Sequence, residues 1–186
     1  MASVVLKIYD LSGGMARQMS GALLEGRVIE AVPHTGVVVF GREYFFGGGI
    51  QVLKETEVER AIGRKAYKHE ALGVTTKTEA DLDAYLRSIA REWTADSYDL
   101  WRRNCNHFAS NLCRFLLGDD TEVFPRWILD LPNDVLATPL GQMLSGVLGE
   151  QQNQLNARLS SAAAGTEYGG RVPENGKEAA AAAKEE

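Results

Sequence analysis

The pattern of apolar and polar positions predicts short strands in the N-terminal part of the chain. β-Branched and aromatic residues gather there in runs that glycine and proline interrupt. A strand is expected where such a run lies between two of these breaks. The expected strands cover residues 4–9, 27–32, 35–40 and 43–46, with a tight turn at 41–42. Residues 50–76 have a mixed pattern that favours no single element.

Three segments repeat apolar residues at the spacing of a helix that buries one face. Residues 15–24 form the first of them. The second begins after Thr78, where Asp81 three residues later completes a capping box. The third begins after Asn104, a favourable N-cap, and ends at Gly118, a favourable stop. The chain therefore combines strands with amphipathic helices.

Composition changes near residue 150. Residues 151–186 consist mainly of Ala, Glu, Gly, Gln and Asn, and Tyr168 is their only aromatic residue. Such a segment has few side chains with which to build a core. A chain of 186 residues is long enough for one domain of ordinary size. We therefore expect a folded domain over residues 1–148 and a flexible, low-complexity tail over residues 149–186.

Charge, hydropathy and cysteine usage exclude several classes of protein. The formal net charge of −5 argues against nucleic-acid binding through a basic surface. No apolar run approaches the roughly 18 residues of a membrane span, and the N-terminus lacks the pattern of a secretory signal. The two cysteines, Cys105 and Cys113, fit a reducing cytosolic or nuclear compartment rather than a disulfide framework.

Cys105 is the strongest candidate for a catalytic group. It lies in the first turn of the helix that follows Asn104. The positive end of the helix dipole and the unpaired N–H groups of a first turn both favour a thiolate. The backbone N–H groups of Cys105 and Asn106 could also hold an oxyanion. The segment therefore has the properties of a nucleophile that needs a base nearby.

Histidine is the side chain best suited to be that base at neutral pH. His107 follows Cys105 by two residues, so on a helix the two side chains point apart. His69 lies between Lys68 and Glu70 and is expected to face solvent. His34 lies at the start of a strand beside small residues, which leave room for a substrate. By elimination, His34 is the best candidate base.

Structural interpretations of the same residues stay open at this point. Cys105 could be an inert core cysteine, since free cysteine is often buried. His34 could be a turn histidine with a structural hydrogen bond. Cys113 is expected to be a packing residue. Cys105 and His107 lack the second ligand pair that a metal site needs, so no metal is expected.

Several blocks, in the same order along the chain, resemble the PPPDE family, the desumoylating isopeptidases with a circularly permuted papain-like fold. The resemblance covers about residues 3–145, and Pro33 departs from it, because a bulky apolar residue is expected before the histidine. The blocks are Tyr9–Ser12 with Gly14–Ser20, His34–Gly41, Glu43–Ile50, Asn104–Phe108, Trp127–Ile128 with Leu131–Pro132, and Thr138–Gly141.

The resemblance implies an α+β, permuted papain-like fold, with a small antiparallel sheet or barrel packed on helices. It implies a catalytic dyad of Cys105 and His34 that works without a cofactor. The expected reaction is hydrolysis of the isopeptide bond between a lysine and a ubiquitin-like modifier, SUMO or ubiquitin. Members of the family can pair, which makes a homodimer one expected assembly. A channel for the modifier's Gly-Gly tail is expected along the glycine loop, which consists of Gly47, Gly48 and Gly49.

Other functions share these motifs. A protein S-acyl thioesterase (a depalmitoylase) would form the same acyl-enzyme on Cys105. A lecithin:retinol acyltransferase-like lipid enzyme shares an Asn-Cys-x-His-Phe element, but such proteins tend to carry a membrane anchor. A non-catalytic adaptor that binds ubiquitin-like modifiers would not need the intact Cys105 and His34 that this chain has. The glycine loop could equally be an ordinary hairpin connection.

Overall fold

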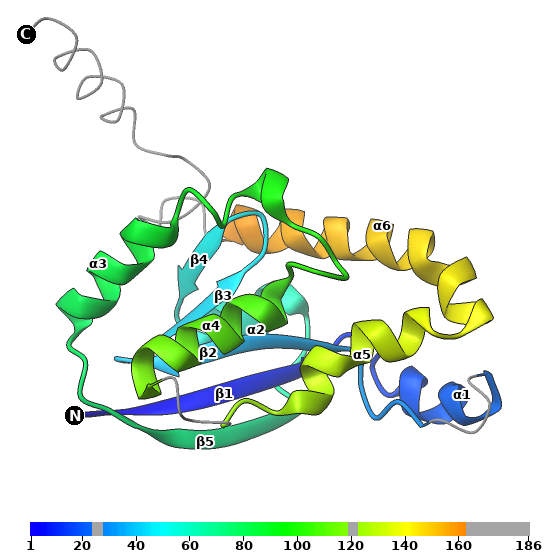
Figure 1. Cartoon of the computed structure of the whole chain (residues 1–186), viewed down its shortest axis with the longest axis horizontal. Helices are drawn as coiled ribbons and strands as arrows, with labels where there is room; N and C mark the ends of the chain where they lie inside the picture. The colour runs from blue at the N-terminus through cyan, green and yellow to red at the C-terminus, as the bar shows by residue number, and fades with distance from the viewer. Residues whose placement is uncertain (24–27, 119–122, 163–186) are drawn as a thin grey trace, which may run out of the picture.

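The computed structural model describes residues 1–23, 28–118 and 123–162, and a five-stranded antiparallel sheet forms its centre (Figure 1). The strands lie in the order β4-β3-β2-β1-β5, so the sheet is open and not closed into a barrel. Strands β1 to β4 lie side by side in chain order, and β5 returns to pair with β1 at the opposite edge from β4. The strand bounds are β1 (Ala2–Asp10), β2 (Pro33–Val39), β3 (Arg42–Phe46), β4 (Ile50–Leu53) and β5 (Lys68–Thr75).

Helices cover both faces of the sheet. Helix α4 packs its apolar residues on one face, together with residues of α3. Helix α2 and the C-terminal half of α6 cover part of the other face. The helices of the described residues are α1 (Met15–Leu23), α2 (Glu55–Ile62), α3 (Glu79–Ile89), a 3-10 helix (Ala95–Ser97), α4 (Cys105–Leu117), α5 (Arg126–Leu136) and α6 (Pro139–Ala162). No helix in the described parts of the chain is long and apolar enough to span a membrane.

The expected strands over 4–9, 35–40 and 43–46 are confirmed as β1, β2 and β3, although β2 begins earlier, at Pro33. The strand expected over 27–32 is wrong: residues 28–32 have no regular structure, and Arg27 lies outside the described residues. Side chains satisfy the backbone donors of this segment instead of a neighbouring strand. Ile29 N–H donates to Ser20 Oγ at 2.7 Å, and Val32 N–H donates to Asp10 Oδ1 at 3.0 Å.

The expected starts of α3 and α4 are confirmed. Both were predictable from sequence because each depends on a local cap. Thr78 and Asp81 form the capping box of α3. Asn104 Oδ1 accepts hydrogen bonds from the N–H groups of Asn106 and His107, at 2.9 and 3.2 Å, and so caps α4. Gly118 ends α4 with a φ of 98°, a value that glycine tolerates best. The α4 cap fixes Cys105 as the first residue of its helix.

Residues 149–162, the first part of the expected tail, belong to helix α6. Helix α6 runs without a break through the expected boundary to Ala162. Gln152, Asn156 and Leu159 recur at helical spacing and are buried. Gln152 Nε2 donates to Asn156 Oδ1 at 3.0 Å, so the two amides partly satisfy each other where they are buried. The part of the expected tail over 163–186 lies outside the described residues.

Replacing Leu159 by alanine should lower the free energy of unfolding by about 2–4 kcal/mol. Leu159 is fully buried against a second core cluster that includes Tyr9, Phe45 and Val58. Its removal would leave a cavity under α6. Chemical denaturation measures the loss, with Gln154→Ala as a control at an exposed position of the same helix. A loss of under about 0.5 kcal/mol for Leu159→Ala would show that this part of α6 does not pack on the domain.

Candidate active site

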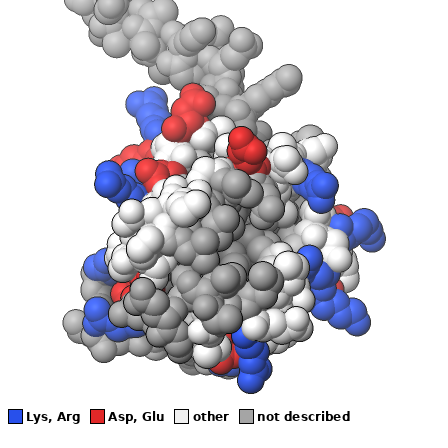
Figure 2. All heavy atoms as spheres, turned by 90° about the vertical axis from the view of Figure 1, so that its right-hand side faces the viewer, with Lys and Arg blue, Asp and Glu red and all other residues white. Residues whose placement is uncertain are grey.

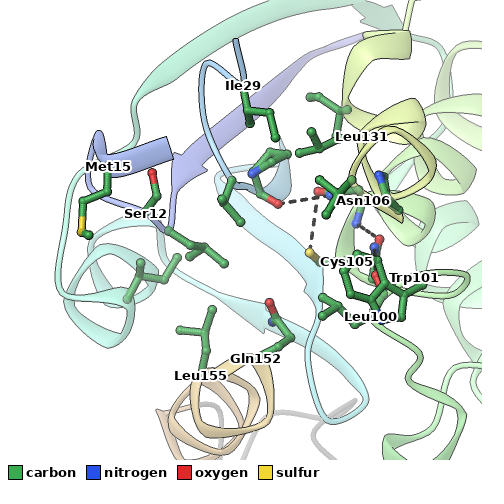
Figure 3. A pocket seen from close by; sticks show the side chains of 18 of the residues that line it. Ser12, Met15, Ile29, Leu100, Trp101, Cys105, Asn106, Leu131, Gln152 and Leu155 are labelled. Carbon is green, nitrogen blue, oxygen red and sulfur yellow. Dashed lines mark hydrogen bonds between the residues drawn. The ribbon is translucent and has the colours of Figure 1, made fainter. Parts of the chain in front are cut away.

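Cys105 lies on the wall of a cavity of about 470 Å³ (Figure 3). The capped start of α4 holds the thiol there, and only 2% of the residue is exposed. The cavity is lined mainly by apolar side chains from six parts of the chain. These are Leu11, Ser12 and Met15; Ile29, Val32 and Pro33; Ile62 and Arg64; Leu100, Trp101, Asn104, Cys105 and Asn106; Ile128, Leu131, Pro132 and Val135 of α5; and Gln152, Leu155 and Arg158 of α6.

The molecule is seen in Figure 2 from the side on which α1 and α5 lie. Lysine, arginine, aspartate and glutamate side chains lie mostly along the margin of this face, and the described residues nearer its centre are uncharged. The lining of the cavity agrees with this distribution, because Arg64 and Arg158 are its charged members. An apolar surface with few charges favours an uncharged ligand segment or chain.

Strands β2 and β3 separate beside the cysteine. Their pairing covers only Val37–Val39 of β2, whereas the pairing of β2 with β1 continues to Pro33. Asn106 of α4 contacts the part of β2 that β3 leaves unpaired. Its Nδ2 donates to Pro33 O at 3.1 Å, and its Oδ1 accepts from Thr35 Oγ1 at 3.0 Å. The start of β2 is thereby joined to the start of α4.

Burial raises the pKa of the Cys105 thiol to about 11. Hydrogen bonds from the backbone of Thr35, from the Tyr98 hydroxyl and from the first N–H groups of α4 act in the opposite direction but are weaker. The first turn of α4 thus favours the thiolate, as expected, but burial has the larger effect on the pKa of the thiol. Loss of hydration disfavours the charged thiolate more than the helix start favours it.

His34 is the second residue of β2, opposite Tyr9 of β1. It is fully buried, and its ring lies between those of Tyr9 and Phe45, with centroid distances of 6.0 and 5.8 Å. Neither ring nitrogen has a hydrogen-bond partner among the described residues. Burial lowers the pKa of His34 to about 4, so the imidazole is neutral at physiological pH. The expected open space beside this histidine is thus occupied by packed side chains.

The structure brings the backbone at His34 close to Cys105 but shows no hydrogen bond between the two side chains. The next residue, Thr35, is closer to the thiol, and its backbone acts to lower the pKa of the sulfur. The other two histidines lie as expected. His107 Nδ1 lies 2.8 Å from Asn104 Oδ1 in the helix cap, and His69 is exposed on β5.

The other candidate residues can also be placed. Cys113 is buried in the core under α4, as expected of a packing residue. The N–H of Asn106 already donates to the Asn104 cap, which leaves the N–H of Cys105 as the remaining predicted oxyanion donor. Within the described residues, no group of three or more His, Cys, Asp or Glu side chains could hold a metal ion.

None of Gly47, Gly48 and Gly49 lines the cavity at Cys105. Gly47 faces α6: a Cβ atom there would lie 3.1 Å from Asn156 Oδ1 and 3.5 Å from Leu159 Cδ1. Gly48 and Gly49 have φ values of 72° and 117° and shape the connection between β3 and β4. The glycine loop therefore allows close packing of a helix here, where a channel for a substrate tail was expected.

Two parts of the site are absent from the sequence-based expectations. Tyr98 acts to lower the pKa of the thiol and belongs to a segment without helical periodicity, so no local pattern marks it. Gln152 and Leu155 reach the cavity from α6. Their helical spacing with Asn156 and Leu159 is a signal, but it lies in a segment of low complexity.

Comparison with known proteins matches residues 2–148 to a model of the PPPDE putative peptidase domain. Desumoylating isopeptidase 1 of Xenopus laevis is 35% identical over 152 residues, which are 81% of this chain and 86% of that protein. The human protein of that name is 35% identical and the rat one 36%, each over 81% of this chain and 87% of its own length. The antiparallel sheet packed on helices is consistent with a permuted papain-like fold. The chain belongs to the PPPDE peptidase family.

Proposed function

We propose that this protein hydrolyses the isopeptide bond between a ubiquitin-like modifier and a lysine, with Cys105 as nucleophile and His34 as acid and base. The observation that supports this most directly is the placement of Cys105, at the capped start of α4 and on the wall of a cavity. SUMO is the proposed modifier, because similar proteins are named desumoylating isopeptidases. A homodimer and a cytosolic or nuclear location are further proposals from the sequence.

In the proposed reaction both groups begin neutral. The imidazole of His34 has two unpaired nitrogens and a low pKa, so it is free to accept a proton. When its ring turns towards Cys105, it takes the thiol proton while the sulfur attacks the carbonyl of the modifier's last glycine. The imidazolium then protonates the departing lysine amine, leaving a thioester. Water, activated by the same imidazole, hydrolyses the thioester and releases the modifier.

The backbone N–H of Cys105 is the proposed donor to the oxyanion of each tetrahedral intermediate. It lies beside the sulfur and already weakly lowers the pKa of the thiol. The Asn106 N–H is engaged by the helix cap and is not needed in this scheme. The oxyanion would thus be held by the rigid first turn of α4.

The test is a comparison of matched substrates. A peptide lysine carrying SUMO through an isopeptide bond, the same peptide carrying ubiquitin, and a palmitoyl thioester are incubated with the purified protein. We expect the highest kcat/KM for the SUMO conjugate. A modifier probe with an electrophilic C-terminus should label Cys105 covalently. Binding of the modifier without labelling or cleavage would instead indicate a non-catalytic adaptor.

The apolar cavity favours a second candidate function, hydrolysis of fatty acyl thioesters on proteins. Leu11, Ile29 and Leu131 are among the apolar side chains that face the same space as Cys105. An acyl chain could occupy this space while its thioester reacts. The measurement is kcat/KM for thioesters of increasing acyl length. A steep rise with length, exceeding the rate on the SUMO conjugate, would favour the thioesterase.

A further inference from the structure

We propose that Asn106 is the positioning residue that fixes His34 relative to Cys105. Its side-chain amide joins the strand on both sides of His34 to the first turn of α4. This inference rests on the proposed function, in which Cys105 and His34 exchange a proton. In other cysteine and serine hydrolases a third residue orients the histidine. We assign a corresponding role to Asn106, which acts through the backbone on both sides of His34.

Asn106 is hydrogen-bonded to the residues immediately before and after His34. The amide donates to the carbonyl of Pro33, one residue before His34, at 3.1 Å. It accepts from the hydroxyl of Thr35, one residue after His34, at 3.0 Å. The thiol of Cys105 approaches the same amide oxygen at 3.6 Å (Figure 3). One buried side chain therefore contacts both neighbours of the proposed base and the proposed nucleophile.

The strand needs this support because its own pairing is incomplete. On the β3 side, the ladder of β2 stops at Val37 and leaves His34 and its neighbours without a partner strand. On the β1 side, His34 is opposite Tyr9. Asn106 supplies hydrogen bonds from α4 where β3 supplies none. With Pro33 and Thr35 held by Asn106, the backbone of His34 between them is held in place relative to α4.

A side-chain amide is suited to hold β2 against α4, because it can donate one hydrogen bond and accept another. The carbonyl of Pro33 needs a donor and the hydroxyl of Thr35 can donate to an acceptor, and a carboxamide offers both from one buried side chain. Asn106 is 5% exposed and Thr35 is fully buried, so loss of either bond leaves a polar group without water. The short side chain of asparagine also limits how far β2 can move from α4.

Other groups face the dyad but do not connect its members. Tyr98 acts to lower the pKa of the Cys105 thiol, and Tyr9 and Phe45 lie against the His34 ring. Arg64 and Arg158 are the charged residues that line the cavity. All of these groups remain when Asn106 is replaced. Asn106→Leu also removes the contact between the thiol and the amide oxygen. Thr35→Val leaves that contact in place, so a narrowed pH profile in both variants is assigned to the spacing of Cys105 and His34.

The test is Asn106→Leu, assayed for hydrolysis of the SUMO conjugate across pH. We expect kcat to fall about 10- to 100-fold with KM within about twofold of wild type, because a small displacement of a catalytic group is costly in rate. The bell-shaped profile should also narrow from both sides. Both groups begin neutral in the proposed reaction, so the acid limb reports the pKa of His34 and the alkaline limb reports that of Cys105. A hydrogen bond from the thiol to the imidazole stabilises both neutral forms and widens the bell, and separation of the two groups removes this effect.

A purely structural role would reduce the amount of active protein but leave the width of the bell unchanged, and that result would overturn the proposal. Asn111→Leu is the matched control, since Asn111 is exposed on the same helix. If Asn106→Leu does not fold, Thr35→Val removes one of the two hydrogen bonds from the strand side. It should lower kcat about three- to tenfold and narrow the bell, and a wild-type profile would overturn the proposal.

Cys105→Ser separates this inference from the proposed function. If Cys105→Ser keeps its activity, the proposed function itself has failed. If Cys105→Ser is inactive while Asn106→Leu is folded and has the wild-type kcat and pH profile, only the role of Asn106 is overturned. The alkylation rate of Cys105 by iodoacetamide across pH gives an independent reading, because it does not depend on the choice of substrate.

Discussion

Replacing Cys105 by alanine or serine should abolish isopeptide hydrolysis, with kcat reduced by about 10⁴-fold or more. Alanine removes the nucleophile. Serine keeps a nucleophilic atom, but its hydroxyl is far less acidic and less nucleophilic than a thiol, so the same imidazole activates it much less. The measurement is single-turnover cleavage of a SUMO–lysine conjugate, with mass spectrometry to detect the thioester on the wild-type protein.

The chain offers a matched control for this prediction. Cys113→Ala makes the same change eight residues later on α4, at a cysteine that is also buried but packs in the core. This variant should form the thioester at the wild-type rate per folded molecule. Retention of activity within about tenfold by Cys105→Ala would exclude Cys105 as the nucleophile. Loss of activity in both variants, with both still folded, would show that packing under α4 limits the reaction.

The start of α4 was predictable from sequence because its causes are local. Asn104 caps the helix by accepting bonds from residues two and three positions later, and Gly118 ends it. The same holds for Thr78 and Asp81 in α3. Sequence therefore located the candidate nucleophile to the residue. The family resemblance then selected His34 as its partner, in agreement with the elimination of His69 and His107.

The protonation states of the site could not be predicted in this way. Burial raises the pKa of the Cys105 thiol, and the residues that line the cavity beside it come from distant segments, among them Leu131 of α5 and Gln152 of α6. No local sequence pattern predicts which distant residues will bury a given side chain. Likewise, the β-strand alternation places His34 and Tyr9 on one face of the sheet, but which helices cover that face depends on the tertiary fold.

Helix α6 shows a different limit. Its buried positions include two amides, Gln152 and Asn156, which are hydrogen-bonded to each other. Because both side chains are polar, a hydropathy pattern does not distinguish them from solvent-exposed residues. A polar composition was interpreted as a tail because buried polar residues are uncommon. The irregular segment 28–32 is the opposite case, since apolar residues suggested a strand where Asp10 and Ser20 hold the backbone in another shape.

His34→Leu should produce an inactive protein that is more stable than the wild type. Loss of the acid and base should lower kcat by about 10²–10⁴-fold. The imidazole has two buried nitrogens without hydrogen-bond partners, so an apolar side chain of similar size removes a desolvation penalty of about 1–3 kcal/mol. Activity and the free energy of unfolding should therefore change in opposite directions at this position. His69→Leu, at an exposed histidine of β5, should change neither.

The gain in stability from His34→Leu should grow as the pH falls. The pKa of His34 is about 4 in the folded protein, below the ordinary value of about 6.5, so between these values the unfolded chain binds a proton that the folded protein does not. Wild-type stability attributable to this group is complete above about pH 6.5 and decreases towards pH 4, by about 3 kcal/mol in all. Urea unfolding of the two proteins at neutral pH and near pH 5 measures the difference. Parallel pH dependences would show that His34 is solvated or paired in the folded protein, and that the burial described for its ring is not its state in solution.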